Sequence, residues 1–157
     1  MIANKAIFLL ISMLWCHMVG DWILQPDIMK NGKCKSWWEK NYPDKLYKND
    51  YMSILFIHSL LWSITTHIPI IVMYLLNGVD LDNTLIGVIM IQMFIHLLID
   101  DTKANEFLIS LGTDQTLHIL QVVGSLIFLM IIKGWKGGTK IWCHHLMITM
   151  LVMRILW

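Results

Sequence analysis

Four long apolar stretches alternate with polar segments along this chain, and each is long enough to cross a membrane as a helix. A spanning helix needs about 20 mostly apolar residues, and it bonds all of its backbone groups internally. The pattern predicts transmembrane helices over residues 6–24, 52–76, 84–100 and 114–132, with a polar loop over 25–51. We therefore expect an all-α protein, a polytopic membrane helical bundle that forms one domain over residues 1–157.

The last apolar stretch, residues 141–157, is short and carries His144, His145 and Arg154. It fits either a fifth span or an interfacial helix. The two adjacent histidines would point to different faces of a helix, which argues against a metal site there. The predicted bundle thus has four transmembrane helices plus this C-terminal element.

Composition supports a lipid environment. Of the 157 residues, 57% are hydrophobic and only 15% are charged, whereas soluble domains are about a quarter charged. The net charge of +1 gives no reason to expect nucleic acid as a partner; membrane lipid is the expected one, and a homo-oligomer is compatible with the pattern. Cys16, Cys34 and Cys143 are odd in number and unclustered, so we interpret them as free thiols.

The distribution of lysines predicts an orientation. Short loops make neighbouring spans antiparallel, and seven lysines then lie on the side of the long loop against four on the other. This bias favours a cytoplasmic long loop in a bacterial inner membrane. The loop also contains Trp37, Trp38, Tyr42 and Tyr47, residue types that rest at headgroup depth, so it can lie on the membrane surface.

The chemical signal is a set of histidines and aspartates spaced four residues apart. His96 and Asp100 end the third span, and Asp114 and His118 begin the fourth in mirrored order. Residues four apart share one helix face, and the antiparallel path places both aspartates near one membrane surface and both histidines about one turn deeper. His17 and Asp21 repeat the spacing in the first span, with HMVGD resembling HLLID, and His58 lies two turns into the second.

Such a set is costly in lipid unless a partner compensates it. An ionised aspartate within a span costs ~2.5–3.5 kcal/mol on insertion scales. A divalent ion supplies the compensation, and mixed imidazole and carboxylate ligands suit zinc best, with manganese or iron as alternatives. The predicted metal ligands are His17, Asp21, His96, Asp100, Asp114 and His118.

A purely structural role is the alternative. Hydrogen bonds between histidine and aspartate on different helices can hold a bundle together without any ion. The number of groups at one depth favours a functional site, because ionisable residues inside a span are functional by default. His67 has no partner in register, so we interpret it as structural.

The segments HMVGDWILQ (His17–Gln25), HLLIDDTK (His96–Lys103) and DQTLH (Asp114–His118), together with Lys30 and His58, resemble a family of small phage and bacterial membrane proteins. The family is known as domain of unknown function 3307, and the likeness spans the first to the fourth predicted helix. It implies a polytopic membrane protein with this His/Asp/Gln pattern and implies no activity. It adds Gln25 and Gln115 to the candidate site and places Lys30 nearby.

Two classes of function fit these residues. The first is a membrane-embedded, metal-dependent hydrolase of a lipid-like or phosphate-bearing amphiphile at the cytoplasmic interface, with the six ligands named above. In it His58 is a ligand or the general base, and Gln25, Gln115 and Lys103 orient the substrate. The second is a metal or proton transporter, or a non-enzymatic phage membrane effector with a structural His/Asp site. Clustering of the polar groups at one end of the spans favours the enzyme, because a transport path is normally polar along its length.

Overall fold

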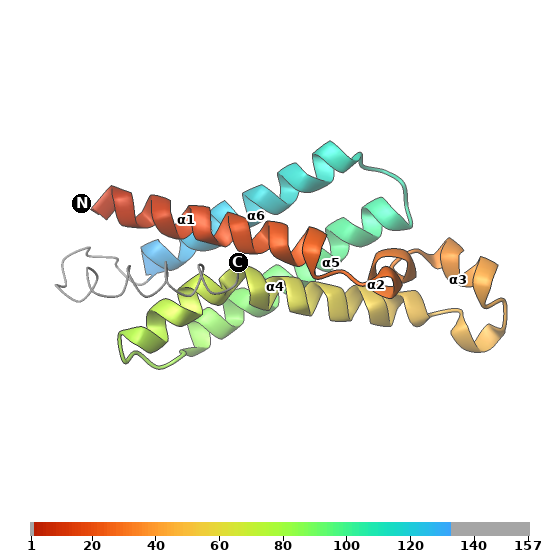
Figure 1. Cartoon of the computed structure of the whole chain (residues 1–157), viewed down its shortest axis with the longest axis horizontal. Helices are drawn as coiled ribbons and strands as arrows, with labels where there is room; N and C mark the ends of the chain where they lie inside the picture. The colour runs from red at the N-terminus through yellow and green to blue at the C-terminus, as the bar shows by residue number, and fades with distance from the viewer. Residues whose placement is uncertain (1, 133–157) are drawn as a thin grey trace.

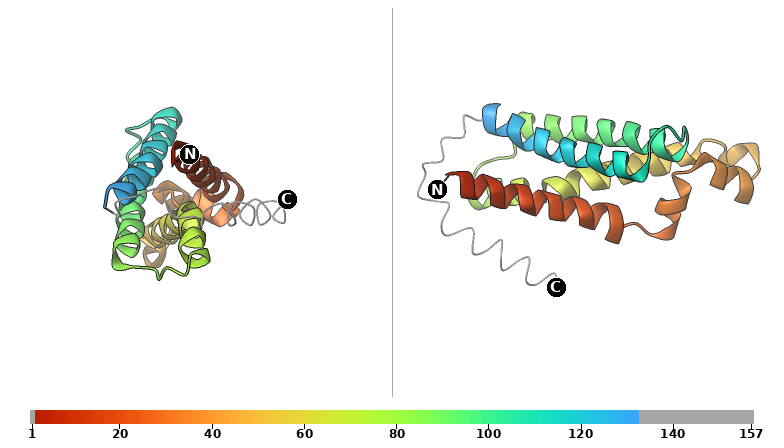
Figure 2. Two further views of the ribbon diagram at one scale, coloured as in Figure 1. Left: turned by 90° about the vertical axis from the view of Figure 1, so that its left-hand side faces the viewer. Right: turned by 90° about the horizontal axis from the view of Figure 1, so that it is seen from above.

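The computed structural model describes residues 2–132, and over these residues the protein is all-α, without a strand. Four long helices form the bundle in Figure 1: α1 (Ile2–Met18) with its π-helical continuation η1 (Val19–Ile23), α4 (Asp50–Leu76), α5 (Asn83–Ala104) and α6 (Leu111–Ile132). The end-on view in Figure 2 shows them side by side around a common centre. The predicted C-terminal element over 141–157 lies outside the described residues.

Four of the described segments are long and apolar enough to span a membrane, which confirms the predicted fold class. They are Ala6–Ile23, Lys45–Leu76, Asn83–Ala104 and Leu111–Ile132. Large apolar side chains such as Ile11, Leu98 and Ile131 are more than half exposed on the outside of the bundle, while histidine, serine and aspartate are buried within it. An apolar outside around a polar inside suits a bundle whose solvent is lipid.

The helices extend beyond the spans predicted from hydropathy. Residue 100 was the expected end of the third span and residue 114 the expected start of the fourth, but α5 continues to Ala104 and α6 begins at Leu111. Hydropathy marks where lipid ends, and a helix continues past that point while its backbone bonds are made. At the other end of the bundle, α4 closes in a Schellman motif with Gly78 at φ 62°, and the Asp82 carboxylate caps α5 by accepting from the Leu85 N–H.

The apolar core fills the half of the bundle that lies away from the long loop. Leu9 and Met13 of α1 pack there against Ile70 of α4, Leu85 of α5 and Leu126 of α6. α4 packs against both α1 and α5, and α6 packs against the same two helices. Close packing in this half holds the four helices in register and so determines which side chains meet in the other half.

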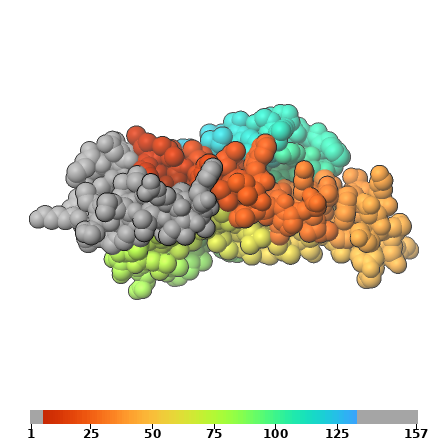
Figure 3. Space-filling model, in the orientation of Figure 1, coloured from red at the N-terminus to blue at the C-terminus, as the bar shows by residue number. Residues whose placement is uncertain are grey.

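The segment predicted as a long polar loop is largely helical. It contains α2 (Asp27–Gly32), α3 (Lys35–Asn41) and the short 3₁₀ helix η2 (Lys45–Tyr47), and Figure 3 shows this part projecting beyond the end of the bundle. α2 packs on α4 at Gly32, where an added Cβ would lie 3.3 Å from Ile54. The aromatic residues of the segment form one cluster of ring contacts: Trp37, Trp38, Tyr42 and Tyr47.

Asn105, which caps the end of α5, fastens this segment over the bundle. Its side-chain oxygen accepts from the Lys35 N–H at 2.7 Å, and its amide group donates to the Lys33 carbonyl at 3.1 Å and to Asp101 at 2.7 Å. Cys34 lies between the two clamped residues, and burial raises the pKa of its thiol. These hydrogen bonds of Asn105 to Lys33 and Lys35, the Asn105 clamp, therefore join two segments about seventy residues apart in sequence.

Removing the clamp should increase the reactivity of Cys34. In a chain whose other cysteines are replaced by serine, Asn105→Ala should expose the thiol and lower its raised pKa, so more thiolate is present at a given pH. The rate of maleimide labelling at pH 7 should rise severalfold over the parent chain. Asn41→Ala removes an exposed asparagine that bonds only within α3, so it should leave the rate unchanged; equal rates in all three proteins would contradict the clamp.

Candidate metal centre

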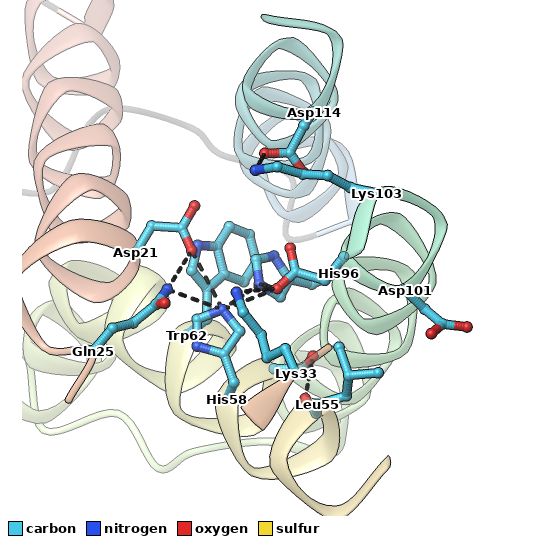
Figure 4. A network of polar contacts seen from close by, with 12 residues as sticks. Asp21, Gln25, Lys33, Leu55, His58, Trp62, His96, Asp101, Lys103 and Asp114 are labelled. Carbon is cyan, nitrogen blue, oxygen red and sulfur yellow. Dashed lines mark hydrogen bonds and ion pairs between the residues drawn. The ribbon is translucent and has the colours of Figure 1, made fainter. Parts of the chain in front are cut away.

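The four long helices bring their ionisable residues together at the end of the bundle nearest α2. Figure 4 shows Asp21 of η1 and His96 of α5 approaching His58 of α4, with Asp114 of α6 nearby. His58, His96 and His118 are at most 2% exposed, and Asp100 is 4% exposed. Residues spread over almost a hundred positions of sequence thus form one buried polar cluster.

Two of the three predicted His/Asp pairs lie together as pairs. His96 Nε2 lies 3.7 Å from Asp100 Oδ2, and His118 Nε2 lies 3.6 Å from Asp114 Oδ1. The pair in the first span differs because the helix widens there into η1, where the Leu24 N–H bonds to the Val19 carbonyl five residues back. A π-turn changes the angle between residues four apart, and Asp21 faces His58 of the neighbouring helix at 3.3 Å.

Asp100 is the hub of the cluster. Its Oδ2 lies 3.3 Å from His58 Nε2 and 2.7 Å from Lys33 Nζ, and its Oδ1 lies 3.3 Å from His118 Nε2. A carboxylate buried to this extent is tolerated only when cationic or donor groups surround it. Asp100 therefore determines the positions of groups from three other segments of the chain.

His58 Nε2 has more lone pairs around it than its own hydrogen can satisfy. It lies 3.0 Å from His96 Nε2, 3.3 Å from Asp21 Oδ1 and 3.3 Å from Asp100 Oδ2. One imidazole nitrogen carries at most one hydrogen, so these acceptors converge on a point that favours a cation. A four-coordinate ion with ligand bonds near 2.0–2.1 Å keeps neighbouring donor atoms about 3.3–3.4 Å apart. The two distances of 3.3 Å to carboxylate oxygens match this spacing, and the 3.0 Å between the two ring nitrogens is shorter.

Two overlapping groups of buried side chains can hold a metal ion. The first is Asp21, His58 and His96, and the second is His96, Asp100 and His118; within each group the ligand atoms lie within 4.8 Å of one another. Both use His96, whose ring is therefore central to either arrangement. Four of the six residues predicted as ligands belong to these groups, and His58 joins them.

His17 lies beside these groups rather than in them. Its Nδ1 accepts the indole N–H of Trp62 at 2.9 Å, so a neutral His17 ring carries its hydrogen on Nε2 and offers no lone pair to a metal. Trp62 in turn stacks on His96, with ring centroids 4.0 Å apart and planes 15° from parallel. Our sequence analysis did not single out Trp62, although it lies four residues after His58 on the same helix face.

Asp114 also lies outside both groups. Its Oδ2 accepts from Lys103 at 2.6 Å and from Gln115 at 3.1 Å, while its Oδ1 has no hydrogen-bond partner among the described residues. Asp114 is 1% exposed as a residue and lines the pocket above the cluster. It is thus a buried carboxylate whose Oδ1 lies 3.6 Å from His118 Nε2 and has no hydrogen-bond partner among the described residues.

Amide and ammonium groups surround the metal groups. Gln25 and Gln115 each donate to a different oxygen of Asp21 at 3.2 Å, so the two glutamines orient that carboxylate. Lys33 pairs with Asp100 across 67 positions of sequence, and no local pattern could have identified it. Lys103, in the last turn of α5, pairs with Asp114, in the first turn of α6, across the short connection between these two helices.

A pocket of about 390 Å³ leads from the cluster to the surface. Three carboxylates and three lysines line it, together with both glutamines and Cys34. Its outer rim is apolar and includes Phe107, which is 77% exposed and adopts φ 56°. A left-handed backbone is a rare conformation for a bulky residue and costs of order 1–3 kcal/mol, and such strain clusters at functional sites.

Comparisons with protein-family models, with curated proteins and with solved structures find no match to this chain. The resemblance to domain of unknown function 3307 stays a prediction that depends on the motifs given above. The function must therefore be argued from the geometry of the cluster and its pocket.

The metal content of the protein should depend strongly on residues of the two groups and much less on the buried residues beside them. Protein purified from zinc-supplemented cells should contain about one metal ion per chain by elemental analysis. Asp100→Asn or His96→Ala should remove most of it, because His96 belongs to both groups and Asp100 contacts members of both. Asp114→Asn should retain at least half. His67→Gln, which changes a buried histidine of α4 outside the groups, is the control and should bind like the parent. Trace metal in every protein would contradict the centre.

Proposed function

We propose that this protein is a membrane-embedded, metal-dependent hydrolase that acts on a lipid-like amphiphile at the membrane surface. The observation that carries the proposal is the convergence of His and Asp donor atoms in two buried groups, from which Asp21 and Asp100 also line a pocket near the end of the bundle. Catalytic metal sites keep one position open to water or substrate, and a site at headgroup depth meets lipids in the orientation they already have.

In this proposal the ion is held by residues of the two overlapping groups: Asp21, His58, His96, Asp100 and His118. Zinc is favoured because it accepts mixed nitrogen and oxygen ligands at tetrahedral spacing; manganese and iron are the alternatives. When bound, the ion acts as a Lewis acid and lowers the pKa of a water to about 7. His17 positions Trp62, which supports the ring of His96.

Asp114 is the group best placed to act as the general base. An aspartate bound to metal cannot also accept a proton, but Asp114 lies outside both groups and its buried Oδ1 has no hydrogen-bond partner among the described residues. It would take a proton from the attacking water and return it to the leaving alcohol. Lys103 and Gln115 hold its other oxygen, Oδ2, in place. Both residues also line the pocket, and there they can orient the substrate.

Location in a bacterial inner membrane with α2 and α3 on the cytoplasmic side belongs to the same proposal. Six lysines lie in the segment from α2 to the start of α4, and anionic lipids of the cytoplasmic leaflet attract such segments. The aromatic cluster around Trp38 offers an anchor at headgroup depth. Together they would place the pocket at the cytoplasmic interface.

Transport is the second candidate, and one observation favours it. Thr66 and His67 of α4 are buried in the half of the bundle beyond the cluster, and each has a polar atom without a hydrogen-bond partner among the described residues. These groups continue a polar track along α4. The packed core of that half, from Met13 to Leu126, favours the enzyme because apolar side chains occupy the rest of the path.

Activity should be separable from metal binding. Metal-loaded protein in liposomes should hydrolyse an ester or phosphoester amphiphile, and Asp114→Asn should lower kcat about 10²-fold or more while the metal content stays near the parent value. His67→Gln is again the matched control with activity expected to be unchanged. No turnover across a broad lipid set, combined with zinc or proton flux that Asp100→Asn removes, would establish transport instead.

The orientation can be tested with Cys34, whose position lies in the long loop. With the other cysteines replaced by serine, an impermeant maleimide should label inverted membrane vesicles and leave intact spheroplasts unlabelled. The positive-inside bias is the physical reason. Labelling of spheroplasts alone would place the pocket on the outer side of the membrane.

A further inference from the structure

The side chains that line the pocket change from acidic at the floor to basic and then apolar at the rim, and this order indicates which kind of ligand fits. Its floor consists of Asp21, Asp100 and Asp114, its walls contain three lysines, and its rim consists of exposed apolar side chains. Resting on the function proposed above, we propose that the substrate is a lipid phosphate monoester. Lys30 binds the phosphate, and the hydrocarbon tail leaves over a rim formed by Trp22, Phe107 and Leu111.

Lys30 differs from the other two lysines of the pocket. Lys33 and Lys103 are paired with Asp100 and Asp114 at 2.7 and 2.6 Å, so their charges are compensated within the protein. Lys30 lines the same pocket, is exposed, and makes no ion pair with any described residue. An uncompensated ammonium group that faces a pocket attracts an anion.

The net charge of the pocket selects among anions. Three carboxylates and three ammonium groups cancel, and the histidines are neutral as metal ligands. One bound divalent ion then leaves a net charge of about +2, which a phosphate monoester of about −1.5 to −2 at pH 7 balances. A phosphodiester would balance only half of it, and a carboxylic ester none.

The rim provides a lateral exit for one apolar chain. Trp22 belongs to η1, while Phe107 precedes α6 and Leu111 begins it, so the rim residues come from two separate segments of the chain. They are 59%, 77% and 55% exposed. A tail that passes between them reaches the lipid around the bundle while its headgroup stays at the metal site. Lysine and arginine side chains divide in the same way, with the apolar stem on an apolar surface and the charged head in a polar one.

The reaction balances without any further co-reactant. The water oxygen bonds to phosphorus, the phosphorus–oxygen bond to the lipid alcohol breaks, and its electron pair stays on the alcohol oxygen. The proton that Asp114 takes from water goes to that oxygen. The products are a lipid alcohol and inorganic phosphate.

The first test measures turnover and binding of chain-matched amphiphiles. Metal-loaded protein should release phosphate from dodecyl phosphate in mixed micelles, and Lys30→Ala should raise KM about ten- to a hundredfold, because a hydrogen bond to a charged group is lost. Lys30→Arg should restore most of the affinity. Lys45→Ala removes an equal charge from the same segment outside the pocket and should have no effect.

The binding arm separates this inference from the proposed function. The Asp114→Asn protein loaded with zinc should bind dodecyl phosphonate in equilibrium dialysis, and adding Lys30→Ala should weaken that binding. Binding that depends on Lys30 without turnover in the parent would reject the hydrolase and keep the ligand class. Hydrolysis of dodecyl acetate without binding of the phosphonate would keep the hydrolase and reject the phosphate.

The tail path has its own readout. Dodecyl phosphonate with a diazirine near the headgroup should crosslink to peptides that contain Trp22 or Phe107. Phe107→Asn should lower the yield, whereas Leu108→Asn, which alters a neighbour that is 76% exposed but does not line the pocket, should not. Crosslinks spread evenly over the lipid-facing residues of α4 and α5 would overturn the exit.

Discussion

Burial of the Asp100 carboxylate inside an apolar bundle is the constraint on which the rest of this structure depends. An aspartate at 4% exposure in a helix long and apolar enough to span a membrane is unfavourable by several kcal/mol unless opposite charge or donors surround it. The protein meets this demand with His58 and His118 from the two helices that pack against α5 and with Lys33 from the long loop. Each of those contacts fixes a different element relative to α5.

The cost of burying charged groups also explains why one half of the bundle is apolar and the other half is polar. The half built around Met13, Ile70 and Leu126 holds the helices together by packing alone, as membrane helices must when lipid is as apolar as their side chains. This frees the other half to concentrate polar groups that would be too costly if scattered. α2 packs on α4 beside that half, and the hydrogen bonds of Asn105 and Lys33 join this segment to α5.

The lysines are as informative as the ligands. Two of them compensate carboxylates that face the pocket, which lets the site keep more acidic groups than its histidines could balance. The third, Lys30, makes no ion pair with a described residue and can bind an anion that enters the pocket. A site that combines residues able to hold a metal ion with one unpaired lysine and an apolar edge is suited to a molecule with an anionic head and a hydrocarbon tail, and both proposals above follow from that combination.

Much of the fold was accessible from the sequence because hydropathy and helical periodicity are local properties. Four apolar stretches predicted four spanning helices, and the spacing of His96 with Asp100 and of Asp114 with His118 predicted shared faces at one end. Helix ends were less accessible, since Asp101 and Lys103 look like loop residues but continue α5. Local patterns report where lipid ends and cannot report where backbone hydrogen bonding ends.

The composition of the candidate site depended on packing between distant segments. Asp21 of η1 contacts His58 of the neighbouring helix, and Trp62 donates to the ring nitrogen that His17 would have offered to a metal. Lys33 meets Asp100 only because α2 packs on α4 beside α5, a contact across 67 residues that no spacing rule encodes. Sequence therefore determined which helices carry the chemistry, and tertiary packing determined which atoms meet, because ligand geometry is set by contacts between helices rather than within them.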